Sequence, residues 1–282
     1  MKIHYNSSSL QKELFPFLED CKSIGFVPTM GALHEGHIAL VEQACNENEC
    51  VVVSIFVNPT QFNNAKDLDK YPRTIDNDIT LLNKVKGKIF VFSPNASEIY
   101  SENVTSKEYN FNGIENEMEG KHRKGHFDGV GTVLDLLFKI IKPNKAYFGE
   151  KDYQQLQIVK KLVEIESFPI NIIGCPIIRE KSGLAMSSRN KRLTEKELNE
   201  ATLIFKILSE VKNKFNELTL VELNTLVEEK FKLNPFLELE YFEIADSESL
   251  KTAHKKQVEV KYRGFIAAFI GGVRLIDNIA LN

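Results

Sequence analysis

The feature that most constrains the fold of this chain is the alternation of strand-like and helix-like segments through its first half. The run CVVVSIFV at 50–57 is almost entirely apolar or β-branched, which is typical of a parallel strand buried on both faces. Similar short runs occur at 23–29, 88–93 and 145–150, and amphipathic segments separate them. This alternation predicts β-α-β units, a parallel sheet and right-handed crossovers.

The helices between these strands are predicted from apolar residues at helical spacing. Thr74 is a candidate N-cap for one of them. The expected helices are 37–48, 73–85, 129–142 and 152–166, and one or two further strands are expected within 169–178.

The character of the sequence changes near residue 178. Beyond it we predict charged amphipathic helices at 194–215 and 219–231, and strands of a smaller sheet at 237–246 and 258–277. The expected fold class is α/β, a Rossmann-like parallel sheet with helices on both faces, followed by a smaller α+β domain. The expected domains are 1–177 and 178–282, the second closing over a site on the first.

Charge and composition argue against two classes of partner. The net charge of −3 over 282 residues is unlike the basic imbalance of a nucleic-acid surface. No apolar run reaches the roughly 18 residues that a membrane span needs, and the N-terminal segment lacks the apolar core of a signal peptide. The four cysteines form no C-x-x-C pair, which favours reduced thiols in a cytoplasmic protein.

Polar clusters follow three of the predicted strands. PTMGALHEGH follows the first, NPTQF the second, and GEKDYQQL a later one. Ligands of open parallel sheets bind at the carboxyl ends of the strands. The three clusters, although distant in sequence, are therefore predicted to meet at one edge and form a site.

The glycine-rich turn from Gly31 to His37 does not match the common nucleotide motifs. In a P-loop, lysine and a hydroxyl residue follow the second glycine, but here His37 and Ile38 take those positions. The G-x-G-x-x-G fingerprint is absent, and the two histidines are three residues apart, not four as in H-E-x-x-H zinc sites. What remains is a strand–turn–helix whose helix start suits phosphate, with His34 and His37 as donors.

Other residues offer compatible chemistry, although each alone is a weak signal. Lys151 follows a strand end and could neutralise a phosphate, with room left by Gly149. The segment AMSSRN at 185–190 combines two hydroxyls with a guanidinium that matches phosphate oxygens. Gln61 and Gln155 are neutral amides suited to orienting a small hydroxy acid.

Taken together, five motifs resemble those of the pantothenate synthetase family. They are PTMGALHEGH, SIFVNPTQF, YPRT, FGEKDYQQL and AMSSRN, and the resemblance extends from about residue 24 to RLIDN at 274–278. The family belongs to the nucleotidylyl-transferase superfamily. The resemblance implies ATP, pantoate and β-alanine as substrates, Mg²⁺ as a companion ion, a pantoyl-adenylate intermediate, and release of AMP and pyrophosphate. It also implies a homodimer formed through the first domain, and the apolar run VVVSIFV is a candidate edge for that contact.

The resemblance also implies roles for individual residues. His34, His37 and Lys151 are the expected catalytic residues, and His37 is the expected proton donor. Gln61 and Gln155 are expected to bind pantoate, with β-alanine near Gln61. The expected ATP-binding residues are Met30, Gly31, Ala32, Leu33, His34, Glu35, Gly36, His37, Gly149, Glu150, Lys151, Asp152, Ile178, Met186, Ser187, Ser188 and Arg189.

Two stretches depart from the family pattern. Lys124 stands where the family usually has proline, which leaves the roles of Arg123 and His126 open. The helix after YPRT often carries an acidic pair near magnesium, but here it reads Asp76-Asn77-Asp78, so Asp78 is a weak metal candidate. Phosphates and water are then expected to hold Mg²⁺, and no protein metal ligand is expected.

Two alternatives remain open from the sequence. A nucleotidylyl transferase acting on another small substrate would leave AMP on its product. A non-catalytic nucleotide sensor would bind ATP without turnover. The two glutamines and the second domain favour the ligase, in which imidazoles at a helix N-terminus would stabilise charge as pyrophosphate leaves.

Overall fold

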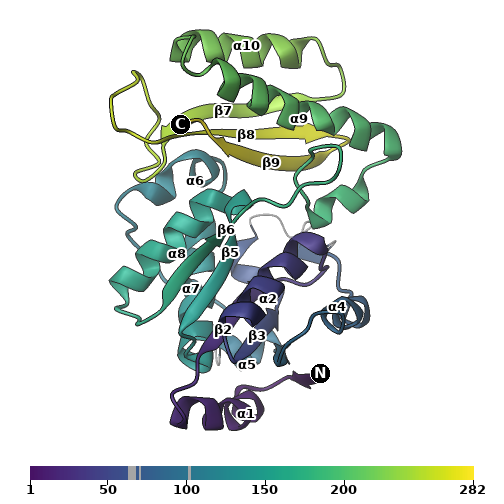
Figure 1. Ribbon diagram of the computed structural model, residues 1–282, viewed down its shortest axis with the longest axis vertical. Coiled ribbons are helices and arrows are strands. Elements are labelled where there is room, and N and C mark those ends of the chain that lie inside the picture. Colours follow the sequence, from purple (N-terminus) through teal and green to yellow (C-terminus); the bar gives the residue numbers. More distant parts are fainter. Residues whose placement is uncertain (63–67, 70, 101–102) are drawn as a thin grey trace. The chain divides into compact units, whose positions relative to one another are not determined.

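A computed structural model describes residues 1–62, 68–69, 71–100 and 103–282. Its elements fall into two compact units (Figure 1). The division into domains at residues 177/178 stays a prediction. The first unit comprises Met1–Glu115, Gly120–Glu150 and Gln155–Pro176, and the second comprises Asn116–Glu119, Lys151–Gln154 and Ile177–Asn282.

The first unit is built on a six-stranded parallel sheet, which confirms the predicted fold class. The strand order is β1-β4-β3-β2-β5-β6. The chain runs outward from β2 through β3 to β4 and then returns to pair β5 with the other side of β2, which creates a topological switch point. The strands are β1 (Lys2–His4), β2 (Ile24–Thr29), β3 (Cys50–Ile55), β4 (Ile89–Phe92), β5 (Lys145–Gly149) and β6 (Asn171–Cys175).

Helices cover both faces of this sheet because its strands are apolar on both sides (Figure 1). Val27 and Val53 share a buried cluster with residues of α2 and α4. The neighbouring Phe26 points to the other face, where its ring lies 6.0 Å from that of Phe138 in α7. The helices are α1 (Ser7–Glu19), α2 (Glu35–Glu47), α4 (Ile75–Leu82), α5 (Ala96–Tyr100), α6 (Met118–His122), α7 (His126–Ile141) and α8 (Tyr153–Ile165), with single turns η1 (Pro59–Gln61), η2 (Ile114–Asn116) and η3 (Glu150–Asp152).

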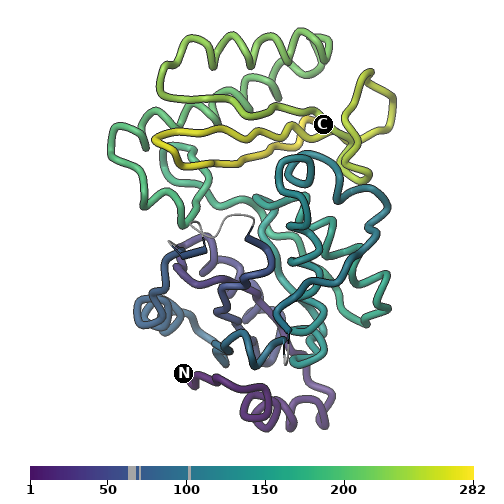
Figure 2. The backbone as a smooth tube through the Cα atoms, turned by 180° about the vertical axis from the view of Figure 1, so that it is seen from behind, coloured from purple at the N-terminus to yellow at the C-terminus, as the bar shows by residue number. Residues whose placement is uncertain are grey.

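The N-terminal segment holds two elements that the sequence patterns do not predict, β1 and α1. Figure 2 follows it in purple from the N-terminus. The strand β1 has three residues and pairs on one side only, so it shows no buried apolar run. The helix α1 contains Pro16 and begins at Ser7; its N-cap is Asn6, whose side chain accepts a hydrogen bond from the amide of Ser9.

The expectation that VVVSIFV supplies an edge for dimer contacts is wrong. Strand β3 pairs with β2 on one side and with β4 on the other. Its apolar composition reflects burial inside the sheet, where both faces and both edges are covered. Among the described residues, the sheet ends instead at β1 and β6.

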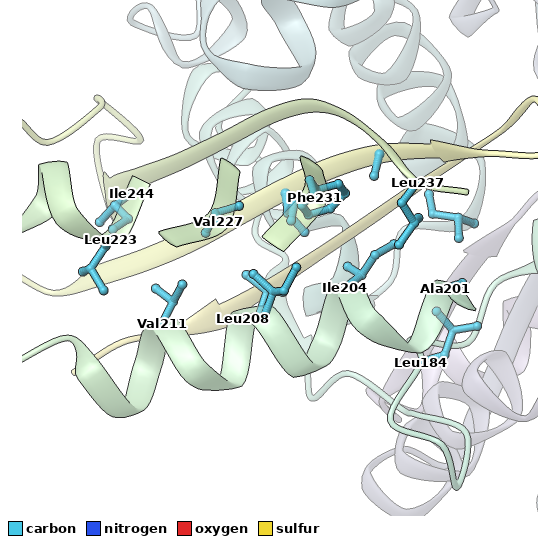
Figure 3. Packing of buried hydrophobic residues seen from close by; sticks show 14 of the residues in the cluster. Leu184, Ala201, Ile204, Leu208, Val211, Leu223, Val227, Phe231, Leu237 and Ile244 are labelled. Atoms are coloured by element: carbon cyan, nitrogen blue, oxygen red, sulfur yellow. The ribbon is translucent and has the colours of Figure 1, made fainter. Parts of the chain in front are cut away.

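The second unit packs two helices on an antiparallel sheet of order β7-β8-β9. Both helices begin with a capping box, in which Thr194 pairs with Glu197 and Thr219 with Glu222. Figure 3 shows their buried side chains meeting residues of the sheet. The predicted strand region 258–277 forms two strands joined at a glycine pair. The elements are η4 (Ser188–Arg192), α9 (Glu195–Lys214), α10 (Leu220–Lys232), β7 (Glu238–Asp246), β8 (Tyr262–Ile270) and β9 (Val273–Ala280).

Candidate active site

Three predicted site segments of the first unit meet at one edge of its sheet. Residues 30–37 follow β2, Gln61 follows β3, and Gly149 ends β5. These strands are neighbours in the order β3-β2-β5, and their carboxyl ends point the same way because the sheet is parallel. The loop at 30–37 and the segment Gly149–Glu150 therefore flank the switch point, the usual ligand position in such folds.

The loop after β2 adopts a left-handed conformation at two consecutive residues. Gly31 has φ 80° and Ala32 has φ 51°. A Cβ atom on Gly31 would lie 3.0 Å from a carboxylate oxygen of Asp78 and 3.1 Å from a methyl carbon of Ile55. Glycine is therefore required at position 31 both by the backbone conformation and by the close approach of a side chain.

Asp78 holds this loop from the first turns of α4. Its carboxylate oxygens accept hydrogen bonds from the amides of Ala32 and Leu33, at 3.1 and 2.8 Å. The hydroxyl of Thr74, expected as a helix cap, makes no cap hydrogen bond and lies 3.2 Å from the same carboxylate. Asp78 is 1 % exposed. Because its oxygens already accept these bonds, Asp78 suits a role in fixing the loop better than a role as a metal ligand.

His34 and His37 lie at the start of α2. His34 is the N-cap, and its Nδ1 accepts a hydrogen bond of 3.2 Å from the amide of Gly36. An accepting Nδ1 leaves the proton of a neutral ring on Nε2. The two imidazole rings are 4.1 Å apart between centroids, so simultaneous charges on both would repel. The pair thus presents imidazole donors at a helix N-terminus, where the backbone already favours an anion.

Gln61 is linked to the neighbouring strand end. Its side-chain oxygen accepts from the amide of Asn58 at 3.0 Å, and its side-chain nitrogen donates to the sulfur of Met30 at 3.2 Å. Asn58 is buried, and it also donates to the carbonyl of Gly129 and accepts from Tyr100. Burial raises the pKa of Tyr100, which keeps this phenol protonated as a donor.

Arg123 and His126, whose roles the sequence leaves open, both lie against the backbone of Gln61. The Arg123 guanidinium donates to the Gln61 carbonyl at 3.3 Å, and His126 Nδ1 lies 2.9 Å from the same oxygen. Gly129, on the first turns of α7, makes this approach possible, because a Cβ atom there would lie 2.4 Å from the carbonyl oxygen of Thr60. The glycines of HFDGVG at 126–131 indicate that another segment approaches this helix closely. The sequence does not indicate that the approaching segment is Thr60–Gln61.

A pocket of about 420 Å³ lies beside the loop in the first unit. It shares Met30 and Gly31 with the predicted ATP-binding residues, and Asp78 lines it. Neither histidine of the loop, nor Gln61, belongs to its lining. The pocket therefore adjoins the predicted site without coinciding with it.

The remaining predicted ATP-binding residues lie in the second unit. Lys151 and Asp152 end the turn η3, and the Lys151 ammonium lies 3.9 Å from the Asp152 carboxylate. Ile178 and Met186 face each other in a short hairpin, joined by a hydrogen bond of 3.0 Å from the Met186 amide to the Ile178 carbonyl. Ser187, Ser188 and Arg189 follow directly, and the Ser187 hydroxyl accepts from the amide of Arg189 at 3.2 Å. That both units face one triphosphate stays a prediction.

The two adjacent glutamines of α8 differ in their surroundings. Gln154 is 4 % exposed, and its side chain binds the backbone of Glu117 and Glu119 in the second unit. Gln155, the predicted pantoate ligand, is half-buried and belongs to the first unit. Consecutive helical residues point about 100° apart. Gln154 therefore makes this backbone contact, and the side chain of Gln155 points in a different direction.

All four cysteines are free thiols, and the three that are buried or half-buried resist ionisation. Burial raises the pKa of Cys45 and Cys175 to about 11 and that of Cys50 to about 12. Across the described ranges, no group of three or more His, Cys, Asp or Glu side chains is arranged to hold a metal ion. None of the helices in those ranges is long and apolar enough to cross a membrane.

Comparisons with known proteins agree over the full length. A family model described as pantoate-beta-alanine ligase matches residues 2–280. The pantothenate synthetase of Christiangramia forsetii is 55 % identical over 263 residues, 93 % of each chain, and that of Flavobacterium psychrophilum is 48 % identical over 100 % of both. Among solved structures, the pantothenate synthetase of Thermus thermophilus matches with TM-score 0.89 at 35 % identity, covering 100 % of this chain and 99 % of that one. The Francisella tularensis pantoate-beta-alanine ligase, complexed with beta-gamma ATP and beta-alanine, matches with TM-score 0.82 at 39 % identity, covering 100 % and 98 %.

Proposed function

Because the chain belongs to the pantoate–β-alanine ligase family, we propose that His34, His37 and Lys151 act on the phosphates of ATP during its reaction. The reaction is the ATP-dependent condensation of (R)-pantoate with β-alanine to pantothenate. Full-length similarity to ligases does not favour the alternative of a nucleotidylyl transferase with another substrate.

The chemistry has two group transfers. A carboxylate oxygen of pantoate attacks the α-phosphorus of ATP, the bond to the bridging oxygen breaks, and pyrophosphate leaves. The amine of β-alanine then attacks the acyl carbon of pantoyl adenylate, loses a proton, and displaces AMP. In the first step negative charge grows on the oxygen between the α- and β-phosphorus atoms, so donors fixed there before the reaction lower its barrier.

The geometry of the loop after β2 is the observation that carries the proposed roles. His34 caps α2 with Nδ1 as acceptor, so the proton of the neutral ring is on Nε2, and the His37 ring lies 4.1 Å away between centroids, tilted by 45°. We assign His37 as the proton donor to the leaving pyrophosphate and His34 as a hydrogen-bond donor beside it. The bonds from Ala32 and Leu33 to Asp78 hold the loop in place before ATP binds.

The other predicted residues complete the substrate sites. Lys151 neutralises phosphate charge, and Gln61 and Gln155 bind pantoate, with β-alanine near Gln61. The hydrogen bond of Gln61 to the buried Asn58 supports an orienting role, because it fixes which way the Gln61 amide points. The residues that surround ATP are Met30, Gly31, Ala32, Leu33, Glu35, Gly36, Gly149, Glu150, Asp152, Ile178, Met186, Ser187, Ser188 and Arg189.

We assign Mg²⁺ to the phosphates of ATP and to water, without a carboxylate ligand from this chain. The oxygens of Asp78 are occupied by backbone amides, which fits a metal poorly. Mg²⁺ is commonly held in this way by substrate phosphates with few protein ligands.

Exchange of pyrophosphate into ATP tests the order of steps. We expect exchange that requires pantoate and does not require β-alanine. Gln155→Ala should raise the KM for pantoate far more than the KM for ATP, because the lost hydrogen bonds are to the acid. Exchange without pantoate, or equal effects on both KM values, would contradict these assignments.

We also propose a cytoplasmic homodimer. The four free thiols, of which Cys50 and Cys175 are buried, fit a reducing compartment. Sedimentation equilibrium that gives one chain mass, 32.1 kDa, at micromolar concentration would argue against the dimer.

A further inference from the structure

We propose that Asn278 in β9 is a positioning residue that sets the location of Lys151 in the second unit. The inference rests on the proposed role of Lys151 toward ATP phosphate. The side-chain nitrogen of Asn278 donates to the carbonyl oxygen of Lys151 at 2.9 Å. Asn278 is 2 % exposed, so this bond forms away from bulk water, where a lost partner is costly.

The direction of the Asn278 amide is fixed by its other partner. Its side-chain oxygen accepts from the guanidinium of Arg263, which can only donate. The Arg263 guanidinium itself lies 4.0 Å above the ring of Tyr153, two residues after Lys151. The nitrogen of the amide therefore has to face the Lys151 carbonyl, and the same cluster holds the start of α8.

The residue before Asn278 holds the other ATP-binding segment of the second unit. Asp277 receives two hydrogen bonds from the Arg179 guanidinium, at 2.6 and 2.9 Å. Arg179 also donates to the carbonyl of Gly183 at 3.1 Å, inside the hairpin that leads to Met186. The Asp277 carboxylate accepts the backbone amide of Asn278 as well, at 2.7 Å.

Two adjacent residues of one strand thus secure both segments. Asp277 holds the hairpin that precedes Ser187–Arg189 through a charged pair, and Asn278 holds Lys151 through a neutral bond. The turn η3 is three residues long, so it has little rigidity of its own. A backbone bond at Lys151 fixes the point from which its side chain extends, and hence where the ammonium can reach.

Asn278→Asp tests this with little change in shape, because a carboxylate keeps the acceptor for Arg263 and loses the donor to Lys151. We expect kcat/KM for ATP in pantoate-dependent pyrophosphate exchange to fall about tenfold, the size of losing one buried hydrogen bond. The KM for pantoate should stay near the wild-type value.

The control is Asn282→Asp, at an exposed position of the same unit with one donated and one accepted hydrogen bond. The Asn282 side chain also donates to a backbone carbonyl, that of Val260 at 2.8 Å, and accepts from a donor, the amide of Tyr262 at 2.7 Å. It touches neither ATP-binding segment through these bonds. We expect exchange rates within about twofold of wild type for this variant, as for a distant site.

A double-mutant cycle distinguishes positioning from general damage. In a Lys151→Ala background, Asn278→Asp should change kcat/KM for ATP less than about twofold, because its effect passes through Lys151. A further loss of about tenfold in that background, or Asn278→Asp behaving like Asn282→Asp, would overturn the inference. Asn278→Ala, which adds no charge, takes the place of the Asp variant in the same cycle if that variant does not fold.

The cycle also separates this inference from the proposed function. Wild-type exchange by Lys151→Ala alone would remove the proposed role of Lys151, and the inference with it. An impaired Lys151→Ala together with an unimpaired Asn278→Asp would leave that role intact and overturn only the positioning by Asn278.

Discussion

The two units hold their predicted phosphate-binding segments by opposite means. In the first, the carboxylate of Asp78 accepts the amides of Ala32 and Leu33. In the second, the amide of Asn278 donates to the carbonyl of Lys151. In the first unit a charged side chain accepts hydrogen bonds from the backbone N–H groups of the segment. In the second unit a neutral side chain donates a hydrogen bond to a backbone carbonyl of the segment.

The difference follows from the conformation that each contact maintains. The first loop contains left-handed backbone at Gly31 and Ala32, and a non-glycine residue there costs free energy that a charged acceptor can offset. The turn at Lys151 is an ordinary 3-10 turn, for which a neutral bond suffices. We therefore expect loss of the first contact to loosen the fold locally, and loss of the second to act mainly on the reaction.

The largest expected effects come from removing the side chains that these contacts serve. His37→Ala and Lys151→Ala should each lower pantoate-dependent pyrophosphate exchange by ~10²-fold or more, the usual cost of losing one preorganised donor. His254→Ala, which removes an exposed histidine of the second unit, is the control and should leave the rate unchanged. Wild-type rates in both His37→Ala and Lys151→Ala would show that neither segment serves catalysis, which would contradict the roles compared above.

Asp78→Asn should have the next largest effect, and this effect should be on the local stability of the loop after β2. An asparagine can offer only one of the two acceptors and would point a donor at the other amide. We expect hydrogen exchange of the Ala32 and Leu33 amides to speed up by about 10- to 100-fold, equivalent to about 1–3 kcal/mol of lost protection. Asp76→Asn, on the exposed side of the same helix, should leave that exchange unchanged. Equal protection in both variants would show that the loop needs no charged acceptor.

Gly31 and Gly149, which lie at or just beyond the ends of two strands, should differ in how much an added methyl group destabilises the protein. Gly31→Ala should destabilise the protein by about 1–2 kcal/mol, since it combines left-handed strain with a contact to Asp78. Gly149→Ala meets no atom within 4 Å of its new Cβ and should leave the thermal midpoint unchanged. Differential scanning calorimetry of both variants measures this, and a similar loss at both glycines would count against it.

The smallest expected effect is at Thr74. Its hydroxyl is the third partner of Asp78, so Thr74→Ala should cost about 0.5–1 kcal/mol of unfolding free energy. Thr74→Ser keeps the hydroxyl and should recover most of that loss. If the serine variant is no more stable than the alanine variant in chemical denaturation, the hydroxyl contributes nothing to the hold on the loop.

The strands of the parallel sheet differ in how well the sequence predicts them. The strands β2 to β6 were predictable because burial on both faces leaves continuous apolar runs, and their shared direction locates residues 30–37, Gln61 and Gly149 at one edge. The short edge strand β1 leaves no such run.

The contacts that hold the site were not predictable from local patterns. Asp78 lies 45 residues from Leu33, and Asn278 lies 127 residues from Lys151. Each is a polar side chain bound to backbone, and every residue offers the same backbone groups. Neither spacing nor residue type could therefore identify the partner, and the family pattern suggested a metal for Asp78 instead.

The placement of β1 carries a consequence for solubility. The residues Lys2–His4 cover the outer hydrogen-bonding edge of β4, whose four residues Ile89–Phe92 are all buried and apolar. Removing β1 would leave a hydrophobic strand with unpaired backbone groups, which is a template for intermolecular β-pairing. A shortened chain could keep every residue of the site and still be lost to aggregation.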